Sequence, residues 1–337
     1  MKIGFFEMEG WEEAIVRKEL FGHELYFSDK KIDEDAIPEV RDFDAISVFV
    51  DSRITPKVLE NFPNLKLVTT NSTGFDHIDI AACKARGITV TFVPGYGNNT
   101  VAEFAFGLLL NLTRKIYLAI YQVEERDDFS LSNLRGIDLK GKTMGILGTG
   151  RIGKEMIKIA KGFGMEVIAY DMYPDVAAAK ELGFSYKTLE EVLGGSDCIS
   201  IHCPLNDSTH HLINMKNINL IKRGAYLVNT ARGPIVETDA IVYALREKIL
   251  AGAGLDVLEE EEETKNEIGF LSKSGSHEEA FKTILENHIL MEMPNALVTP
   301  HNAFNSQEAL MRILDTTIGN IKGFVAGTLD PKNMVNK

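Results

Sequence analysis

The stretch Lys142–Gly153, KTMGILGTGRIG, decides the fold of this chain. It opens with an apolar run that predicts a buried strand, and a helical spacing of apolar residues follows it. Three glycines lie between them. Gly148 permits a tight turn, Gly150 lets a pyrophosphate approach the backbone, and Gly153 lets the helix pack closely on the strand. The free amides of the helix start also favour phosphate, so the stretch predicts a dinucleotide site.

An acid at the end of the next strand predicts which dinucleotide binds. The strand Glu166–Tyr170 ends at Asp171, and none of the next three residues, 172–174, is basic. A carboxylate here accepts hydrogen bonds from the adenosine ribose hydroxyls and repels a 2′-phosphate, so we expect NAD rather than NADP. The alternative for Asp171 is a helix N-cap.

The bulk composition excludes several classes of partner. A chain of 337 residues is long enough for two domains, and 45% hydrophobic and 25% charged residues are ordinary for a soluble protein. A net charge of −13 argues against nucleic acid and anionic membranes as partners. The longest apolar stretch, Ala102–Leu112, is too short to span a bilayer.

The three cysteines, Cys83, Cys198 and Cys203, show neither metal-ligand spacing nor a disulfide framework. We therefore expect no metal. Reduced cysteines and the lack of a secretory h-region at the N-terminus predict a cytoplasmic location.

Strands and helices alternate through the first hundred residues, which predicts a parallel sheet covered by helices. The first strand has no glycine-rich loop after it, so this block does not bind a dinucleotide. The expected strands are Lys2–Phe6, Glu24–Phe27, Ala45–Val50, Leu65–Thr70 and Ile88–Phe92, and the expected helices are Trp11–Leu20, Thr55–Phe62 and Ile78–Arg86.

A second α/β series begins at Lys142, after a long helix expected over Thr100–Glu125 with a capping box at Thr100 and Glu103. Six strands match a doubly wound nucleotide domain. They are expected at Thr143–Leu147, Glu166–Tyr170, Cys198–His202, Tyr226–Asn229, Ala251–Leu255 and Ala296–Thr299, with helices at Lys154–Gly162, Glu278–Leu285 and Gln307–Val325.

Ionisable side chains follow three strands of this series: Arg232, the run Glu259–Glu263, and His301. A guanidinium can hold a carboxylate through a planar fork, and a histidine can donate a proton near neutral pH. A glutamate can orient that histidine and stabilise its charged form. Alone, each has an ordinary alternative: a surface ion pair, a solvated acidic loop, a structural histidine. Their convergence at strand ends of a dinucleotide domain favours hydride transfer to a 2-keto acid.

Motifs along nearly the whole chain also resemble those of a known enzyme family. They are STGFDHID (72–79), VPGY (93–96), TVAE (100–103), the glycine motif, HCPL (202–205), NTARGP (229–234), LDV (255–257) and TPH (299–301). With these motifs the chain resembles the D-isomer-specific 2-hydroxyacid dehydrogenases, most closely their D-lactate dehydrogenase branch.

The resemblance implies an α/β fold of two doubly wound parallel-sheet domains. A Rossmann-type NAD domain at 101–299 is inserted in a flavodoxin-like substrate domain formed by 1–100 and 300–337. It also implies a homodimer, and a small-molecule substrate pair of a 2-keto acid and a D-2-hydroxy acid.

The resemblance further implies roles at matched positions. Arg232 binds the substrate carboxylate, His301 is the acid/base, and Glu261, five residues after Asp256, is its partner; Glu259 and Glu260 are close alternatives. Thr73, Gly74 and Tyr96 are the expected substrate-binding positions. For NAD, the expected residues are Gly148, Gly150, Arg151, Ile152, Gly153, Asp171, Cys203, Pro204, Thr209, Thr230, Ala231 and Asp256.

Two departures from relatives bear on the substrate and the assembly. Asn71 stands where many relatives have an arginine, which disfavours a phosphorylated substrate. The segment 262–293 is longer than in most members, and we expect it to lengthen an oligomer contact or to cover the active-site mouth.

Three alternatives remain. They are a glyoxylate/hydroxypyruvate reductase, a formate dehydrogenase, and an NAD-sensing protein like the corepressors that share this fold. Formate dehydrogenases typically pair their histidine with glutamine, whereas Glu261 is acidic.

Overall fold

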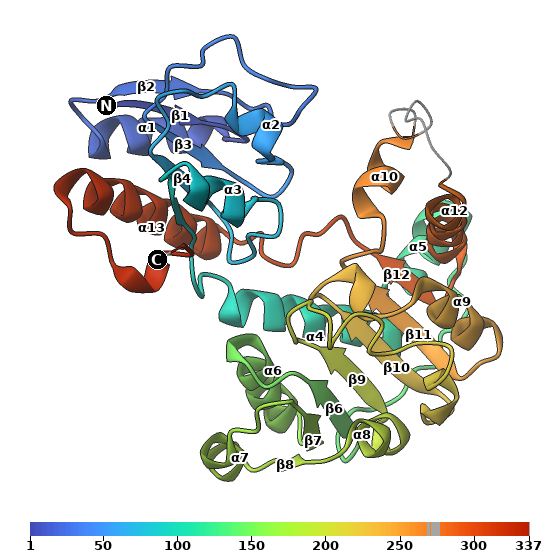
Figure 1. The fold of residues 1–337 in the computed structure, drawn as a ribbon. Coiled ribbons are helices and arrows are strands. Elements are labelled where there is room, and N and C mark those ends of the chain that lie inside the picture. The colour runs from blue at the N-terminus through green and yellow to red at the C-terminus, as the bar shows by residue number, and fades with distance from the viewer. Residues whose placement is uncertain (268–269, 271–276, 337) are drawn as a thin grey trace. The chain divides into compact units, whose positions relative to one another are not determined.

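The chain folds into two compact units, each built on a parallel sheet (Figure 1). This computed structural model describes residues 1–267, 270 and 277–336. Unit 1 comprises Met1–Tyr96 and the C-terminal stretch from Ser306, and unit 2 comprises Gly97–Asn305. Two parallel sheets with flanking helices confirm the predicted fold class.

The sheet of unit 1 has the strand order β2-β1-β3-β4-β5, with all neighbours parallel. This is the flavodoxin-like order. Each strand lies within the range expected from the sequence. The strands are β1 (Lys2–Phe5), β2 (Glu24–Phe27), β3 (Ala45–Val48), β4 (Leu67–Thr70) and β5 (Thr89–Thr91).

Helices cover both faces of this sheet. On one face α13 (Gln307–Ala326) packs with α1 (Gly10–Glu19), because its apolar stripe buries Leu314, Ile318 and Ile321 in the same cluster as residues of β1, β3 and β4. The opposite face carries α2 (Pro56–Leu59) and α3 (Ile80–Ala85). The two ends of the chain therefore share one hydrophobic core.

The sheet of unit 2 has the order β12-β11-β10-β9-β6-β7-β8, again all parallel. The chain reverses its direction of strand addition between β6 and β9, which is the switch point where doubly wound folds bind ligands. The strands are β6 (Thr143–Leu147), β7 (Glu166–Tyr170), β8 (Ser185–Tyr186), β9 (Cys198–Ile201), β10 (Ala225–Asn229), β11 (Leu250–Leu255) and β12 (Ala296–Val298). β8 could not be predicted from the sequence, because two residues cannot show a period.

The helices of unit 2 form two layers. α4 and α6 pack together and share one cluster with the sheet, while α8, α9 and α12 lie against the other cluster (Figure 1). The helices are α4 (Asn98–Arg114), α5 (Ile116–Arg126), α6 (Arg151–Gly162), α7 (Val176–Leu182), α8 (Leu189–Gly195), α9 (Thr238–Arg246), α10 (Glu261–Lys265) and α12 (Glu278–Glu292).

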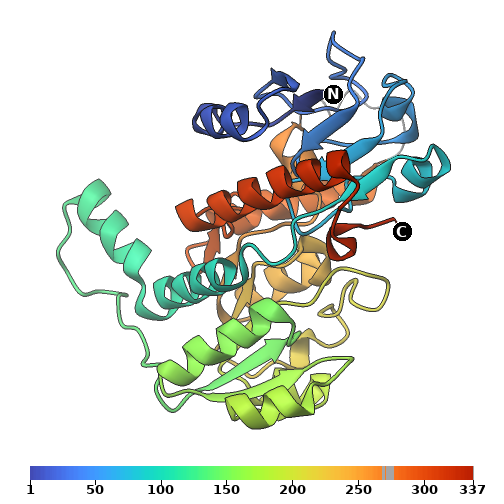
Figure 2. The same cartoon turned by 90° about the vertical axis from the view of Figure 1, so that its left-hand side faces the viewer.

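The single long helix expected over Thr100–Glu125 is wrong. Lys115 adopts a left-handed conformation, with φ of 53°, and separates α4 from α5 with a bend of 63°. In Figure 2, α5 projects away from the sheet of unit 2. The expected capping box is also wrong, because α4 begins earlier, at Asn98, and its N-cap is Gly97.

Within the described residues, no single helix is both long and apolar enough to cross a membrane; α4 and α5 satisfy that test only when taken together across their bend.

The expected helix near Glu278–Leu285 is present and continues to Glu292. The rest of the long segment 262–293 is described only in part, since residues 268–269 and 271–276 of it lie outside the described residues.

Two of the glycines in the decisive stretch are required by packing. Gly148 has a φ of +95°, and a Cβ there would lie 2.5 Å from the backbone nitrogen of Cys203. A Cβ on Gly153 would lie 2.1 Å from the carbonyl oxygen of Gly148. The start of α6 therefore touches the turn backbone to backbone, as the sequence predicts.

We expect Gly153→Ala to lower the free energy of unfolding of unit 2 by about 1–3 kcal/mol, because the added methyl group must displace main-chain atoms. Gly162→Ala is a matched control in the same helix, since nothing lies within 4 Å of its Cβ position. It should be neutral or stabilising. Urea unfolding of both variants measures the difference, and equal effects would contradict the packing argument.

Candidate active site

The unit 2 residues singled out from the sequence lie at or just beyond the carboxyl ends of its strands. The glycine motif follows β6, Asp171 follows β7, Arg232 follows β10, and His301 follows β12. Since all these strands are parallel, these segments gather along one edge of the sheet.

The loop that carries Arg232 is held by the side chain of Asn229 and by close packing of its backbone. Asn229, the last residue of β10, donates from Nδ2 to the carbonyl of Arg232 at 2.9 Å and accepts from the amide of Ala231 at 3.0 Å. A Cβ on Gly233 would lie 2.0 Å from the carbonyl carbon and oxygen of Leu258. The Arg232 loop thus presses against the segment that follows β11.

His301 and Glu261 face each other across the ends of β11 and β12. The Nδ1 atom of His301 lies 3.4 Å from Oε1 of Glu261, and both side chains are mostly buried. His301 has a φ of 54°, a left-handed conformation that is costly outside glycine. The surrounding hydrogen bonds must therefore hold the loop in this form.

The carboxyl group of Glu261 is strongly acidic. Burial acts to raise its pKa, but His301 and Lys265 outweigh burial and lower the pKa to about 2. Lys265, one helical turn along α10, lies 2.9 Å from the same carboxylate oxygen. The ionised form therefore stabilises the fold above the ordinary value of 4.5, and that contribution is lost as the pH falls toward 2.

Asp256 holds the loop that carries His301. Its carboxylate is fully buried and accepts hydrogen bonds from the hydroxyl of Thr299 at 2.5 Å and from the amides of Asn302 and Ala303, both at 2.8 Å. Burial raises the pKa of this carboxyl group, and these three hydrogen bonds and His301 oppose the rise.

The three neighbouring glutamates have different partners. Among the described residues, Glu261 is the only acidic residue that lies within ion-pair distance of His301. Glu259 instead contacts His211 and accepts two hydrogen bonds from Thr238. Glu260, with a φ of 47°, is the residue that turns the chain into α10. This arrangement favours Glu261 over its two neighbours as the partner of His301.

The residues at the switch point fit a dinucleotide. The N-cap of α6 is Gly150, which offers no side-chain cap to the first amides, and nothing lies within 4 Å of its Cβ position. The helix start is thus open for a pyrophosphate. The hydroxyl oxygen of Thr230, just after β10, is buried and finds no hydrogen-bond partner among the described residues, as expected of a group that a ligand satisfies.

Asp171 contacts the glycine turn. Its Oδ2 atom accepts from the amide of Thr149 at 2.6 Å and from the hydroxyl of Thr149 at 2.9 Å. The N-cap of the next helix, α7, is Asp175, so the N-cap alternative for Asp171 is excluded. The remaining expected cofactor positions after β9 lie in one turn, where the hydroxyl of Thr209 donates to the carbonyl of Pro204 at 2.6 Å. Burial raises the pKa of the neighbouring Cys203 thiol to about 11, so this thiol stays protonated.

The expected substrate-binding residues Thr73, Gly74 and Tyr96 lie in unit 1, after β4 and β5. The Thr73 hydroxyl donates to the carbonyl of Val93 at 2.8 Å, and the Ser72 hydroxyl donates to the carbonyl of Gly74 at 2.6 Å. Among the described residues, no hydrogen bond from the amides of Thr73 or Gly74 is present. Two rigidly held amides are therefore available to an anion.

Sequence reasoning missed several supporting residues. Lys265, Gly233 and Thr238 all help to fix the loops of this edge, yet only the helical spacing from Glu261 to Lys265 could have been read in advance. The other contacts join segments that are distant in sequence.

Comparison with known proteins identifies the family. Residues 106–303 match the family described as "D-isomer specific 2-hydroxyacid dehydrogenase, NAD binding domain". The chain belongs to the D-isomer-specific 2-hydroxyacid dehydrogenases. The resemblance seen in the sequence motifs is confirmed, and this family member is an NAD-dependent dehydrogenase.

Similar proteins match over most of the dehydrogenase chain. The D-lactate dehydrogenase of Escherichia coli (strain K12) is 35% identical over 341 residues, which cover 99% of this chain and 100% of that protein. The glyoxylate reductase of Thermococcus litoralis is 37% identical, over 89% of this chain and 86% of its own. The structure of D-lactate dehydrogenase from Aquifex aeolicus complexed with NAD and lactic acid has a TM-score of 0.86 and 34% identity, over 99% of both chains.

We expect Glu261→Gln to move the upper pH limit of keto-acid reduction downward, because the lost carboxylate no longer stabilises the imidazolium of His301. Steady-state NADH oxidation across pH measures this limit. Since the pKa of Glu261 is about 2, this carboxylate does not itself titrate in the working range of the assay.

Glu259→Gln and Glu260→Gln are the matched controls for this shift. An unchanged profile in Glu261→Gln, together with a shift in either neighbour, would show that another glutamate is the partner of His301.

Proposed function

We propose that this dehydrogenase interconverts a 2-keto acid and a D-2-hydroxy acid, as a D-lactate dehydrogenase does. The observation that carries the proposal is the His301–Glu261 pair, 3.4 Å apart, at the same sheet edge as Arg232. An acid/base with a charged partner and a carboxylate-binding cation are the two groups that this reaction requires.

Each residue has a defined task in this proposal. NADH, when bound, supplies the hydride. The guanidinium of Arg232 binds the substrate carboxylate with two parallel hydrogen bonds and draws charge from the ketone. Protonated His301 donates a proton to the carbonyl oxygen, and ionised Glu261 stabilises the imidazolium before that transfer. In the reverse direction neutral His301 removes the hydroxyl proton.

The substrate-binding role of Thr73 and Gly74 in unit 1 stays a prediction. The hydroxyls of Ser72 and Thr73 hold the loop after β4 by donating to the carbonyls of Gly74 and Val93. Asn71, directly after β4, has a structural role in unit 1. Its Oδ1 atom accepts hydrogen bonds from the hydroxyls of Ser47 at 3.0 Å and Thr317 at 2.8 Å. An uncharged amide at this position offers no cation to a phosphate group, which supports an unphosphorylated substrate.

A glyoxylate or hydroxypyruvate reductase is the second candidate, because one relative at 37% identity is named a glyoxylate reductase. Both candidates use the same acid/base and the same carboxylate site, so they differ only in the substrate side chain. The purified enzyme with NADH and a panel of pyruvate, phenylpyruvate, 2-ketoisocaproate, glyoxylate and hydroxypyruvate, ranked by kcat/KM, separates them.

We expect Arg232→Lys to lower kcat/KM for every active keto acid by roughly 10²-fold or more, because lysine keeps the charge but loses the planar fork. The affinity for NADH should stay near wild type, as measured by fluorescence titration. If kcat/KM is unchanged for all keto acids, the carboxylate is held elsewhere and the proposed mechanism fails.

We further propose that the enzyme is a homodimer that associates through α5. This helix has no fully buried residue and exposes an apolar stripe at one helical spacing: Ile116, Tyr117, Ile120 and Tyr121. Tyr117 also lines a pocket of about 710 Å³ beside Glu261. An apolar surface of this kind on a projecting helix supports burial against a second copy.

Ile120→Asp should convert the dimer to a monomer, because a carboxylate in the centre of the stripe would be desolvated in the interface. Sedimentation velocity measures the mass. Phe21→Asp is the control, since Phe21 is 92% exposed in unit 1 and should leave the dimer intact. A wild-type monomer, or a dimer that survives Ile120→Asp, would contradict the interface.

The cytoplasmic location stays a prediction. It is supported by three free cysteines, of which Cys83 and Cys198 are buried. Burial raises the pKa of these two thiols to about 11 and about 12, so neither is poised to react.

A further inference from the structure

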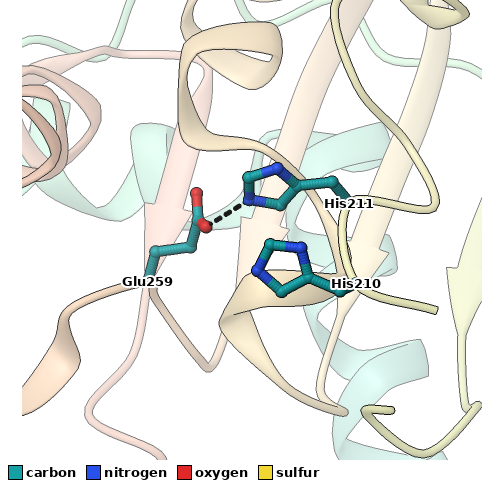
Figure 3. Close-up of side chains that lie close together, drawn as sticks. All are labelled: His210, His211 and Glu259. Atoms are coloured by element: carbon teal, nitrogen blue, oxygen red, sulfur yellow. Dashed lines mark hydrogen bonds and ion pairs between the residues drawn. The ribbon is translucent and has the colours of Figure 1, made fainter. Parts of the chain in front are cut away.

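Two histidines and a glutamate meet in unit 2 away from His301. His210 and His211 lie in the turn after β9, and Glu259 lies in the segment after β11 (Figure 3). The Nε2 atom of His211 is 2.7 Å from Oε1 of Glu259, and the two imidazole rings stack with centroids 4.0 Å apart. One ligand atom from each of the three residues lies within 4.8 Å of the others.

The backbone brings the two rings to the same side. Consecutive side chains of an extended chain point in opposite directions, but His211 has a φ of 49° and so turns the chain. Its amide donates to the carbonyl of Pro234 at 2.8 Å, and Asn214 donates from Nδ2 to its carbonyl at 2.7 Å. The strained turn is therefore anchored on both sides of the peptide unit.

Glu259 is held in place by the other loop. Its Oε2 atom accepts hydrogen bonds from the amide and the hydroxyl of Thr238, each at 2.7 Å. Its carbonyl accepts from Nδ2 of Asn287 at 2.8 Å. These bonds leave Oε1 directed at His211, and only 14% of the side chain is exposed. One carboxylate oxygen is thus fixed and ready to act as a ligand.

We propose that His210, His211 and Glu259 bind a divalent transition metal, with Zn²⁺ as the best match. Two imidazoles, one carboxylate and an open fourth position for water form a ligand set that Zn²⁺ takes in other proteins. Imidazole-rich sites also favour Zn²⁺, Cu²⁺ and Ni²⁺ over Mg²⁺ and Ca²⁺, which prefer oxygen.

The geometry needs only a small adjustment. Ligand atoms around a tetrahedral Zn²⁺ lie about 3.3 Å apart, so the contact between His211 and Glu259 must open slightly. The side chain of His210 is exposed and makes no hydrogen bond among the described residues, so its ring can turn without breaking one. Figure 3 shows a ring nitrogen of each histidine on the side of Glu259.

The ion would connect two loops of the sheet edge. It would join the turn around His210 to Glu259, two residues before Glu261, and so brace the segment that carries Glu261. An ordinary ion pair between His211 and Glu259 does not need His210. The third residue therefore distinguishes a metal site from an ion pair, and the test is built on it.

The experiment titrates ZnCl₂ into metal-free enzyme, prepared with EDTA and then desalted, by isothermal calorimetry. We expect one Zn²⁺ per chain in the wild type and an affinity weaker by at least about tenfold in His210→Ala. Zn²⁺ should also raise the Tm of the wild type more than that of this variant. The matched control is His288→Ala, which removes another surface histidine beside a glutamate, Glu267, and should bind as the wild type does.

Three results would overturn the site. They are no stoichiometric binding to the wild type, equal affinity in the wild type and His210→Ala, and loss of the binding in His288→Ala. The Tm of metal-free His210→Ala should equal that of the metal-free wild type, which shows that the variant is folded. Co²⁺ gives an independent readout: the intense visible band of tetrahedral coordination should appear in the wild type and be absent from His210→Ala.

Discussion

The buried carboxylate of Asp256 is the constraint on which the candidate site depends. It accepts three hydrogen bonds from the loop at 299–303, and His301 lies within that loop with a left-handed backbone. A buried charge is costly unless it is fully bonded, so the loop cannot relax without leaving this carboxylate unpaired. The cost of desolvating Asp256 thereby holds His301 in a strained position beside Glu261.

Close backbone contacts also constrain the edge of the unit 2 sheet at which the carboxyl ends of its strands lie. Gly153 touches the turn at Gly148, and Gly233 touches the segment after β11 at Leu258. At both places a methyl group would meet main-chain atoms, which cannot move aside as a flexible side chain can. The loops that carry the dinucleotide motif and Arg232 are therefore positioned by main-chain packing.

Much of the fold could be predicted from the sequence. The parallel α/β organisation, eleven of the twelve strands in the described residues to within two residues at each end, and the packing role of Gly153 follow from periodicity and from glycine spacing. The break at Lys115 was not readable, because no glycine or proline lies between Arg114 and Ile116 and a left-handed lysine leaves no compositional mark. The expected capping box failed for a related reason: Thr100 and Glu103 have the right spacing, but the helix had already begun at Asn98.

The sequence by itself determined the family and the dinucleotide motif. It also predicted that Arg232, His301 and the run Glu259–Glu263 lie near one another, because each follows a strand and parallel strands end at one edge, and the family resemblance favoured Glu261 within that run. Only the tertiary structure decided which of three consecutive glutamates faces His301, since a left-handed turn at Glu260 sends Glu259 to His211 and Glu261 to His301. Only it could bring His210 and His211 to Glu259. Those contacts join residues about fifty positions apart, and their pairing is set by strand order and loop packing, which no local pattern records.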